Sequence, residues 1–394
     1  MPRIRPLATA ALLPLLLAGC GAGANADAPT WVPKPSFSGE GRQAPVSPAQ
    51  PQPTRPPGSG GNATPSPSSS SEQDPFVVAT KLVTPDAIAV LPDNTALVGE
   101  RTTGRIVLVQ PEAGKPVRTV RTLPGVDGAG DGGLLDLALS PNFLQDRLVF
   151  AYLTTATDNR VVAFTLSGPV TPVLTGIPRG TTGNGGRIAF GADERLYVAT
   201  GDAGSPQLAA DRTSLAGKVL RVTDVGRPAS GNPLGNSPVY TLGHHSVVGL
   251  CPVLDDNQLL EVESAGTEIN QLQSGDDYGW PTTALSSQGP ISTLPSGMTA
   301  PGGCAVIDNL LFVTSRDGQA LLSAELTEKG AAISVGKFRP SLQRKYGRLL
   351  TIVPAADGAL WITTSNRDGH GKPARTDERV LRIIPATASG NSPA

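Results

Sequence analysis

Cys20 is the residue whose surroundings specify a chemistry most narrowly. It ends the sequence Leu17-Ala18-Gly19-Cys20, which follows a basic start and an apolar stretch over residues 7–17. An apolar stretch that crosses about 30 Å of hydrocarbon needs roughly 20 residues, so a cleaved signal peptide over 1–19 is expected instead. The pattern is that of a lipobox, and it predicts an exported lipoprotein anchored to the outer face of the cell membrane by acyl chains on Cys20. A cysteine that follows an ordinary secretory signal by accident is the alternative.

Four further residues could do chemistry, and each also has a structural interpretation. Asp202 ends an apolar segment, where its side chain could simply cap the following turn. Arg316 and Arg348 could be solvated cations, and His245 stands next to another histidine in a chain that has only three. What these residues do depends on the elements that hold them.

The composition divides the chain into a tether and a folded part. The chain has 46 Gly, 38 Pro and 4% aromatic residues, which suits a turn-rich β-protein joined to a disordered segment. We expect a lipidated cysteine and a disordered Pro/Ser-rich tether over 20–74, because such a composition buries too little apolar surface to fold. A folded domain over 75–386 and a short disordered tail over 387–394 complete the prediction. With 32 Lys+Arg against 33 Asp+Glu, the chain has no excess of basic residues with which to bind nucleic acid.

The folded part contains six copies of one pattern. In each copy an apolar segment leads through a turn rich in Pro, Asp, Asn and Gly into a returning apolar segment and a shorter third one. Repeats of about 40 to 60 residues with several strands each are typical of propeller blades, and no long stretch has helical periodicity. The sequence therefore predicts an all-β fold, a six-bladed β-propeller of four-stranded antiparallel blades. The copies begin at Ala87, Leu135, Arg187, Val248, Gly303 and Thr351.

Cys251 and Cys304 are the two cysteines of the folded part. Outside the cytoplasm they could form a disulfide. They lie on equivalent first strands of neighbouring repeats, but their positions within those strands differ by one residue, which would point them to opposite faces. Buried free thiols are therefore the favoured interpretation, and a disulfide is the alternative.

Seven short sequences, in this order, resemble the PQQ-dependent glucose/sorbosone dehydrogenases. The resemblance covers nearly the whole domain, and the lipobox, the tether and residues 129–134 are similar to the LppZ-type lipoproteins of actinobacteria. It implies oxidation of a sugar, in which a base takes a hydroxyl proton while hydride passes to PQQ. The seven sequences are residues 100–106, Gly132-Gly133-Leu134-Leu135, Gly185-Gly186-Arg187, Ala199-Thr200-Gly201-Asp202, residues 214–222, Thr241-Leu242-Gly243-His244 and Tyr278-Gly279-Trp280-Pro281.

The residues that would carry this chemistry are largely replaced. The family's base is the histidine of a His-Asn-Gly-Gly-Arg sequence, and Gly183 stands at its position here. Loss of a general base typically costs about 10² to 10⁴ in rate. Asp202, which the resemblance makes the residue that orients the base, is present. His245 stands at the position of an arginine that contacts cofactor and substrate, and it is a candidate replacement base.

The implied PQQ site is altered as well. Asp131 stands where the family has a glutamine, and Arg316 stands at a lysine position. Arg348 matches the first of two arginines that hold the cofactor, whereas Leu350 stands at the second. The resemblance thus implies PQQ, and these replacements argue against it.

Calcium is implied and disfavoured in the same way. The loop that supplies carbonyl oxygens to the catalytic Ca²⁺ in the family is shortened here to residues 263–268. Ca²⁺ takes six to eight oxygen ligands, and a shorter loop removes some of them. Glu268 and Tyr278 match positions at which relatives hold a second, structural Ca²⁺.

Three functions remain open from the sequence. The favoured one is a surface lipoprotein whose propeller binds a sugar-like ligand, a wall fragment or a partner protein with little or no dehydrogenase turnover, because the base position is Gly183. An active PQQ-dependent sugar dehydrogenase, acting on CH–OH groups through an altered site, is the alternative. A metal-dependent hydrolase of the lactonase type is the third, and the sequence offers no matching set of central acidic residues for it.

Overall fold

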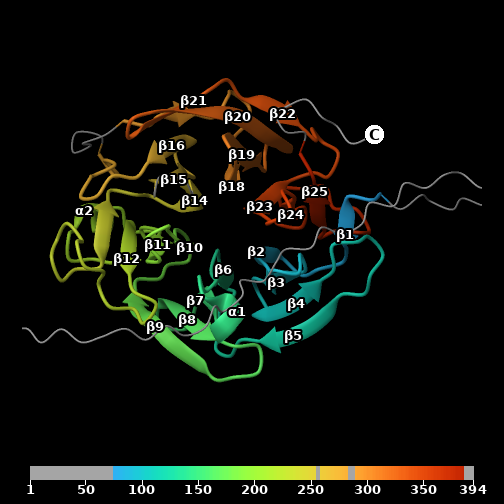
Figure 1. Cartoon of the computed structure of the whole chain (residues 1–394), viewed down its shortest axis with the longest axis horizontal. Helices are drawn as coiled ribbons and strands as arrows, with labels where there is room; N and C mark the ends of the chain where they lie inside the picture. The colour runs from blue at the N-terminus through green and yellow to red at the C-terminus, as the bar shows by residue number, and fades with distance from the viewer. Residues whose placement is uncertain (1–73, 254–257, 283–288, 386–394) are drawn as a thin grey trace, which may run out of the picture. The chain divides into compact units, whose positions relative to one another are not determined.

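The computed structural model describes residues 74–253, 258–282 and 289–385. In this part of the chain six antiparallel sheets surround a central axis (Figure 1). The described helices, α1 (Phe143–Asp146) and α2 (Gln207–Ala210), have four residues each. None in the described ranges is long and apolar enough to span a bilayer. The signal peptide, Cys20, nearly all of the tether and the tail from 387 lie outside the described residues.

The first three blades follow one another along the chain, and each runs from an inner to an outer strand. Blade one comprises β2 (Pro85–Val90), β3 (Ala96–Glu100), β4 (Arg105–Val109) and β5 (Arg118–Thr122). Blade two comprises β6 (Leu134–Leu139), β7 (Val149–Thr154), β8 (Asn159–Phe164) and β9 (Val170–Ile177). Blade three comprises β10 (Gly185–Phe190), β11 (Leu196–Thr200), β12 (Lys218–Val222) and β13 (Val239–Leu242).

The last three blades complete the ring. Blade four comprises β14 (Val247–Val253), β15 (Gln258–Glu263), β16 (Glu268–Gln271) and β17 (Ser292–Thr293). Blade five comprises β18 (Pro301–Ile307), β19 (Leu310–Ser315) and the long β20 (Ala320–Lys329), whose outer edge pairs with both β21 (Ala332–Val335) and β22 (Arg339–Ser341). Blade six comprises β23 (Leu349–Pro354), β24 (Leu360–Thr364), β25 (Val380–Ile383) and, as its outermost strand, β1 (Val77–Ala79). The prediction of six four-stranded blades is confirmed, with the outer position of blade five divided between two short strands.

Hydrophobic cores lie between the blades. Six clusters of buried side chains are present among the described residues, and each joins one pair of neighbouring blades. Successive residues of an inner strand therefore pack in opposite directions: Ala87 packs against blade two and Ile88 against blade six. Since side chains alternate across a strand, a strand that is buried on both faces reads as an apolar run, which is what each of the six copies shows.

One turn recurs between the inner strand and the next strand of blades one, three and six. In blade one, Leu91 N–H donates to Thr95 O at 2.7 Å, and the Asp93 carboxylate accepts the N–H of Thr95 at 3.0 Å. Asp193 and Asp357 accept the N–H two residues ahead in the same way, at 3.1 and 3.2 Å. The aspartate thus acts as the turn residue that the sequence pattern predicted.

Every inner strand begins with an irregularity in its pairing register. The shifts lie between Pro85 and Ala87, Leu134 and Asp136, Gly185 and Arg187, Val247 and Gly249, Pro301 and Gly303, and Leu349 and Ile352. A bulge leaves a residue out of the ladder and turns its side chain away from the regular face. Six bulges at the same height around the axis therefore bring a ring of residues toward the centre.

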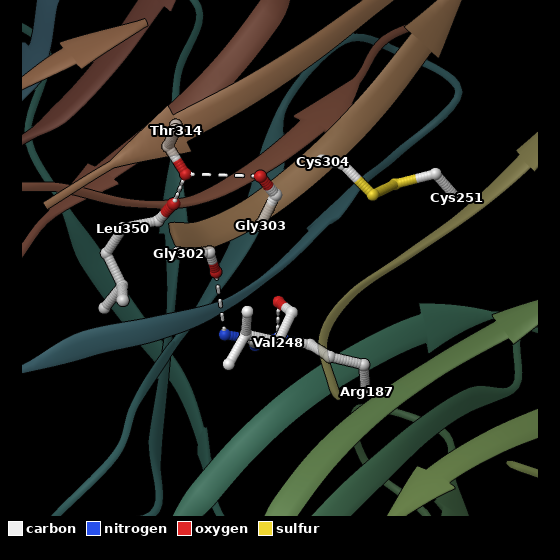
Figure 2. The surroundings of a disulfide bond; sticks show 8 residues. All are labelled: Arg187, Val248, Cys251, Gly302, Gly303, Cys304, Thr314 and Leu350. Carbon is white, nitrogen blue, oxygen red and sulfur yellow. Dashed lines mark hydrogen bonds between the residues drawn. A yellow bond between two sulfur atoms is a disulfide. The ribbon is translucent and has the colours of Figure 1, made fainter. Parts of the chain in front are cut away.

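The structure joins Cys251 and Cys304 in a disulfide with a Cα–Cα distance of 5.9 Å (Figure 2). The preference for free thiols is thus corrected in favour of the alternative. Cys251 lies two residues after the bulge at Gly249 and Cys304 one residue after Gly303, so they do point to opposite faces of their own blades. Opposite faces are what a bond between neighbours requires, because the forward face of blade four packs on the rear face of blade five.

Candidate functional site

A cavity of about 280 Å³ lies at the centre of the ring, where the bulges converge. Bulge residues of five blades form part of its wall, and other strand residues and loops between and within blades supply the rest. Arg187 borders this cavity and also a second one of about 300 Å³ that is lined by inner strands. Its side chain therefore lies between two spaces along the axis. The lining residues of the first cavity include Asp86, Asp131, Leu135, Thr182, Gly183, His245, Ser246, Val248, Ser264, Gly302, Arg316 and Leu350.

The Arg187 guanidinium connects the blades through hydrogen bonds. It donates to Leu135 O at 2.7 Å, to Val248 O at 2.9 Å and to the Asp86 carboxylate at 3.0 Å, with a longer contact of 3.4 Å to Gly302 O. Figure 2 shows the bonds to Val248 and Gly302 beside the disulfide. Asp86 also accepts the Thr351 hydroxyl at 3.2 Å, so this pair of side chains reaches all six blades. Burial lowers the pKa of Arg187, but the charges of Asp86 and Asp136 raise it overall.

Asp136 lies next to Arg187 and is 6% exposed. Its carboxylate accepts the N–H groups of Leu137 and Ile188, each at 2.9 Å. Burial raises the pKa of Asp136 to about 7, even though Arg187 and the two N–H groups favour the charged form. The family motifs gave no sign of this residue as a titrating group.

At Gly183, where the resemblance places the family's base, a side chain would meet the Asp202 carboxylate. Its φ angle is +70°, and a Cβ added there would lie 2.5 Å from Asp202 Oδ1 and 3.0 Å from Gly204 N. The Gly183 N–H donates to Asp131 Oδ2 at 2.7 Å, and the other Asp131 oxygen accepts from the Asn184 side chain. Asp131 thus fixes the backbone of this loop from the rim of the cavity.

His245 and Asp202, which lie on different loops of blades three and four, approach each other in the structure. The His245 Nε2 atom is 3.9 Å from Asp202 Oδ2, and Nδ1 is 3.2 Å from the Ser264 hydroxyl. Trp280 packs against the His245 ring at 4.6 Å and donates its indole N–H to Asp202 Oδ2 at 2.9 Å. Asp202 is 2% exposed, whereas the His245 side chain is 34% exposed and borders the central cavity. The arrangement presents a histidine to the cavity with an acidic residue behind it.

The two candidate arginines have different surroundings. Arg316 borders the central cavity, and its Nε donates to Ala300 O at 3.3 Å. Burial, with the charge of Arg348, lowers the pKa of Arg316. Arg348 instead forms ion pairs with Asp317 at 2.6 Å and Asp368 at 2.9 Å, and it does not border the cavity. Of the predicted cofactor-binding residues, the structure brings Asp131 and Arg316 to one cavity and places Arg348 outside it.

Glu268 and Tyr278 border a separate cavity of about 600 Å³ beside blade four. The Tyr278 hydroxyl donates to Gln271 O at 2.7 Å, and burial raises the pKa of both Tyr278 and Glu268. The same cavity is bordered by Glu263 and Asn270. The two residues predicted for a structural calcium therefore share a cavity wall.

Three buried side chains at this wall form a cluster that the sequence motifs did not predict. His244, Glu261 and Glu263 present ligand atoms that all lie within 4.8 Å of one another. Burial and the charge of Glu263 raise the pKa of Glu261 well above its usual range. The signal was present in the sequence, because Glu261 and Glu263 interrupt an apolar strand at alternate positions and so lie on one face.

The comparisons with known proteins agree with the fold and the motifs. A family model described as glucose / sorbosone dehydrogenase matches residues 82–290, more than half of the 394 residues. The chain belongs to the glucose/sorbosone dehydrogenase family. The PQQ-bound form of an aldose sugar dehydrogenase from Streptomyces coelicolor superposes with a TM-score of 0.72 at 38% identity, covering 78% of this chain and 95% of that one.

Two further relatives match over a smaller part of the chain. Quinoprotein glucose dehydrogenase B from Acinetobacter calcoaceticus is 32% identical over 255 residues, which are 54% of this chain and 53% of that protein. Aldose sugar dehydrogenase YliI from Escherichia coli is 30% identical over 227 residues, 52% of this chain and 61% of that protein. The chain thus spans little more than half the length of these two relatives.

The fit of PQQ, which the glucose/sorbosone dehydrogenase family implies, can be judged from the charges of the cavity. PQQ is a tricarboxylate, so its site needs a net positive charge. The described lining contributes two arginines, Arg187 and Arg316, and two aspartates, Asp86 and Asp131. Arg187 is already satisfied by Asp86 and backbone oxygens, and Leu350 contributes no charge. These side chains do not fit a tricarboxylate well.

Proposed function

We propose that this member of the glucose/sorbosone dehydrogenase family is a cell-surface lipoprotein that binds a sugar-like ligand in its central cavity with little or no dehydrogenase turnover. One observation carries the proposal: Gly183 stands at the base position, and the Asp202 carboxylate fills the space in which a side chain would begin. A glycine at this position cannot take the proton of a bound sugar hydroxyl. The cavity would then hold the sugar without oxidising it.

The lining of the cavity supports a neutral polyol better than an anion. Thr182, Ser246 and Ser264 supply hydroxyl groups, and Asp131 and Arg316 add an acceptor and a donor of opposite charge. Hydroxyls both donate and accept hydrogen bonds, so a mixed set of this kind matches the alternating needs of sugar hydroxyl groups.

The test is a titration of the protein with PQQ and Ca²⁺ and, separately, with a panel of neutral mono- and disaccharides. Melting temperature and quinone absorbance are followed together. We expect saturable stabilisation by at least one sugar, weakened by Asp131→Asn, and no spectral shift up to high micromolar PQQ. Sugar-dependent dye reduction with PQQ would contradict the absence of turnover, and no stabilisation by any sugar would contradict the ligand class.

Attachment to the membrane is a separate part of the proposal, supported by the lipobox at Cys20. Two or three acyl chains, each contributing about 0.8 kcal/mol per buried CH₂, hold a protein stably where one chain holds it marginally. Metabolic labelling with palmitate should mark the wild-type protein in the membrane fraction, whereas Cys20→Ala should be unlabelled and released. Equal labelling of both proteins would exclude Cys20 as the anchor.

PQQ-dependent sugar oxidation is the second candidate, favoured by the PQQ-bound Streptomyces relative and by His245. Because His245 Nε2 lies 3.9 Å from Asp202 Oδ2, His245 would take the hydroxyl proton and Asp202 would orient the ring. This candidate predicts dye reduction that falls by about 10² or more in His245→Gln and far less in Ser264→Ala. Equal activity of the two variants would remove His245 from this role.

A further inference from the structure

His244, Glu261 and Glu263 form a closed cluster between blades three and four. Their exposed fractions are 0%, 0% and 5%. His244 Nδ1 lies 3.6 Å from Glu261 Oε1 and 3.3 Å from Glu263 Oε1. His244 follows β13, whereas both glutamates lie on β15, so the cluster forms only when the two blades pack together.

Each of the three side chains has one atom held by a partner and another without one. His244 Nε2 is bonded to the Thr241 hydroxyl at 2.8 Å, Glu261 Oε1 accepts from the Asn270 side chain at 2.7 Å, and Glu263 Oε2 accepts the Ser246 N–H at 3.0 Å. The remaining atoms, His244 Nδ1, Glu261 Oε2 and Glu263 Oε1, are buried and make no hydrogen bond. Buried polar atoms are rarely left unsatisfied, because each one costs about 1–3 kcal/mol.

The outer partners orient the cluster in the way that metal sites require. When His244 Nε2 carries the proton and donates it to Thr241, Nδ1 presents a lone pair toward the two carboxylates. Metal-bound histidines usually donate their second N–H to such a partner, which fixes the tautomer and the ring. The Tyr278 ring stacks on His244 at 4.9 Å and restricts the imidazole further.

The charge of the cluster also points to a cation. Two neighbouring carboxylates are buried here, and among the described residues their one ion-pair partner is the imidazole of His244. A buried pair of like charges is costly unless a cation or a proton offsets it. The cavity bordered by Glu263 and Asn270 gives an ion a route to the cluster.

We propose that His244, Glu261 and Glu263 bind a zinc-class divalent cation between blades three and four. One imidazole nitrogen and two carboxylate oxygens are a ligand set that Zn²⁺ accepts, with a fourth position left for water. Ca²⁺ instead takes six to eight oxygens, so it is a poor match for a site with a nitrogen ligand. The site differs from the calcium position expected at Glu268 and Tyr278, although Tyr278 packs against it.

The test uses the full chain, purified in detergent, stripped with a chelator and titrated with Zn²⁺ or Ca²⁺ in a calorimeter. We expect one saturable Zn²⁺ site and a rise in melting temperature that Ca²⁺ does not produce. Thr241→Val removes the outer partner of His244 and should weaken Zn²⁺ binding by roughly 10–100-fold. Glu261→Gln removes a ligand and should weaken Zn²⁺ binding by more than that. Glu112→Gln, at an exposed glutamate between β4 and β5 of blade one, is the control and should bind Zn²⁺ like the wild type.

A second readout separates a metal site from a structural cluster. In the metal-free protein, Glu261→Gln should raise the melting temperature, because it removes a buried carboxylate and keeps the partner of Asn270. With saturating Zn²⁺ the order should reverse, since only the wild type gains from the ion. No saturable Zn²⁺ uptake by the wild type, or equal uptake by wild type and Glu261→Gln, would overturn the proposal.

Discussion

At the scale of single residues, Asp202 lies behind two residues of the cavity wall, Gly183 and His245. One of its oxygens accepts the Gly204 N–H at 2.8 Å, and the other accepts the Trp280 indole N–H at 2.9 Å. The first oxygen also occupies the space beside Gly183. Asp202 also faces His245, with 3.9 Å between its Oδ2 atom and His245 Nε2.

Substitution of Gly183 tests this description directly. Gly183→Ala adds a Cβ 2.5 Å from Asp202 Oδ1 at a φ of +70°, so we expect the free energy of unfolding to fall by more than about 1 kcal/mol. Gly125→Ala is the control, because Gly125 has a φ of +72° and nothing within 4 Å of the added Cβ. Urea unfolding of both variants separates the steric contact from the backbone penalty. An equal loss in the two variants would mean that Asp202 moves aside without cost.

Asp136 gives the protein a dependence of stability on pH. Its pKa rises from 3.8 to about 7 on folding, so the folded state holds a proton that the unfolded state has released between these values. Stability is therefore greatest at low pH on this account and falls as pH rises toward about 7, by up to about 1.4 kcal/mol per pH unit. Asp136→Asn should remove this slope, as thermal unfolding between pH 4.5 and 7.5 would reveal. The same slope in both proteins would assign it to another group.

At the scale of elements, the inner strand of each blade and the turn that follows it could be predicted from the sequence. The inner strands could be predicted because both of their faces are buried and an Asp-containing turn follows, as at Asp93 and Asp357. The bulges could not be predicted, because an extra residue in one strand does not change the pattern of a continuous apolar segment. The approach of His245 to Asp202 depends on two loops from different blades, which no local pattern records.

The disulfide links two such elements, the inner strands of blades four and five. It closes a loop with a sequence separation of 53, and breaking it should cost about 2–4 kcal/mol of unfolding free energy. Dithiothreitol should therefore lower the melting temperature of the wild type. The double variant Cys251→Ala, Cys304→Ala should melt lower than the oxidised wild type and ignore the reductant. A wild type that is insensitive to full reduction would show that packing between the blades suffices.

At the scale of the whole molecule, Arg187 is the contact that all blades share, together with Asp86 and Thr351. Arg187→Met removes the nearer cation of Asp86 and leaves Arg101 at 4.0 Å, and breaking a buried pair from one side costs up to about 3–5 kcal/mol. Arg187→Met combined with Asp86→Asn should recover part of that loss in urea unfolding. Arg382→Met, which breaks the more exposed pair with Asp357, should cost less than about 1 kcal/mol. Similar losses of unfolding free energy in Arg187→Met and Arg382→Met would show that the central contact contributes no more than an exposed ion pair.

The ring is closed by β1, which pairs with β25 of blade six although some 300 positions of the chain separate them. Val77 lies opposite Leu381 and Ala79 opposite Val380 in antiparallel order. The start of β1 and the end of β25 therefore lie at the same end of this pair of strands. Tension applied between the residues before β1 and those after β25 would therefore break these hydrogen bonds one at a time, starting from that end of the pair. Mechanical unfolding of the propeller from its two ends would then begin at this pair of strands.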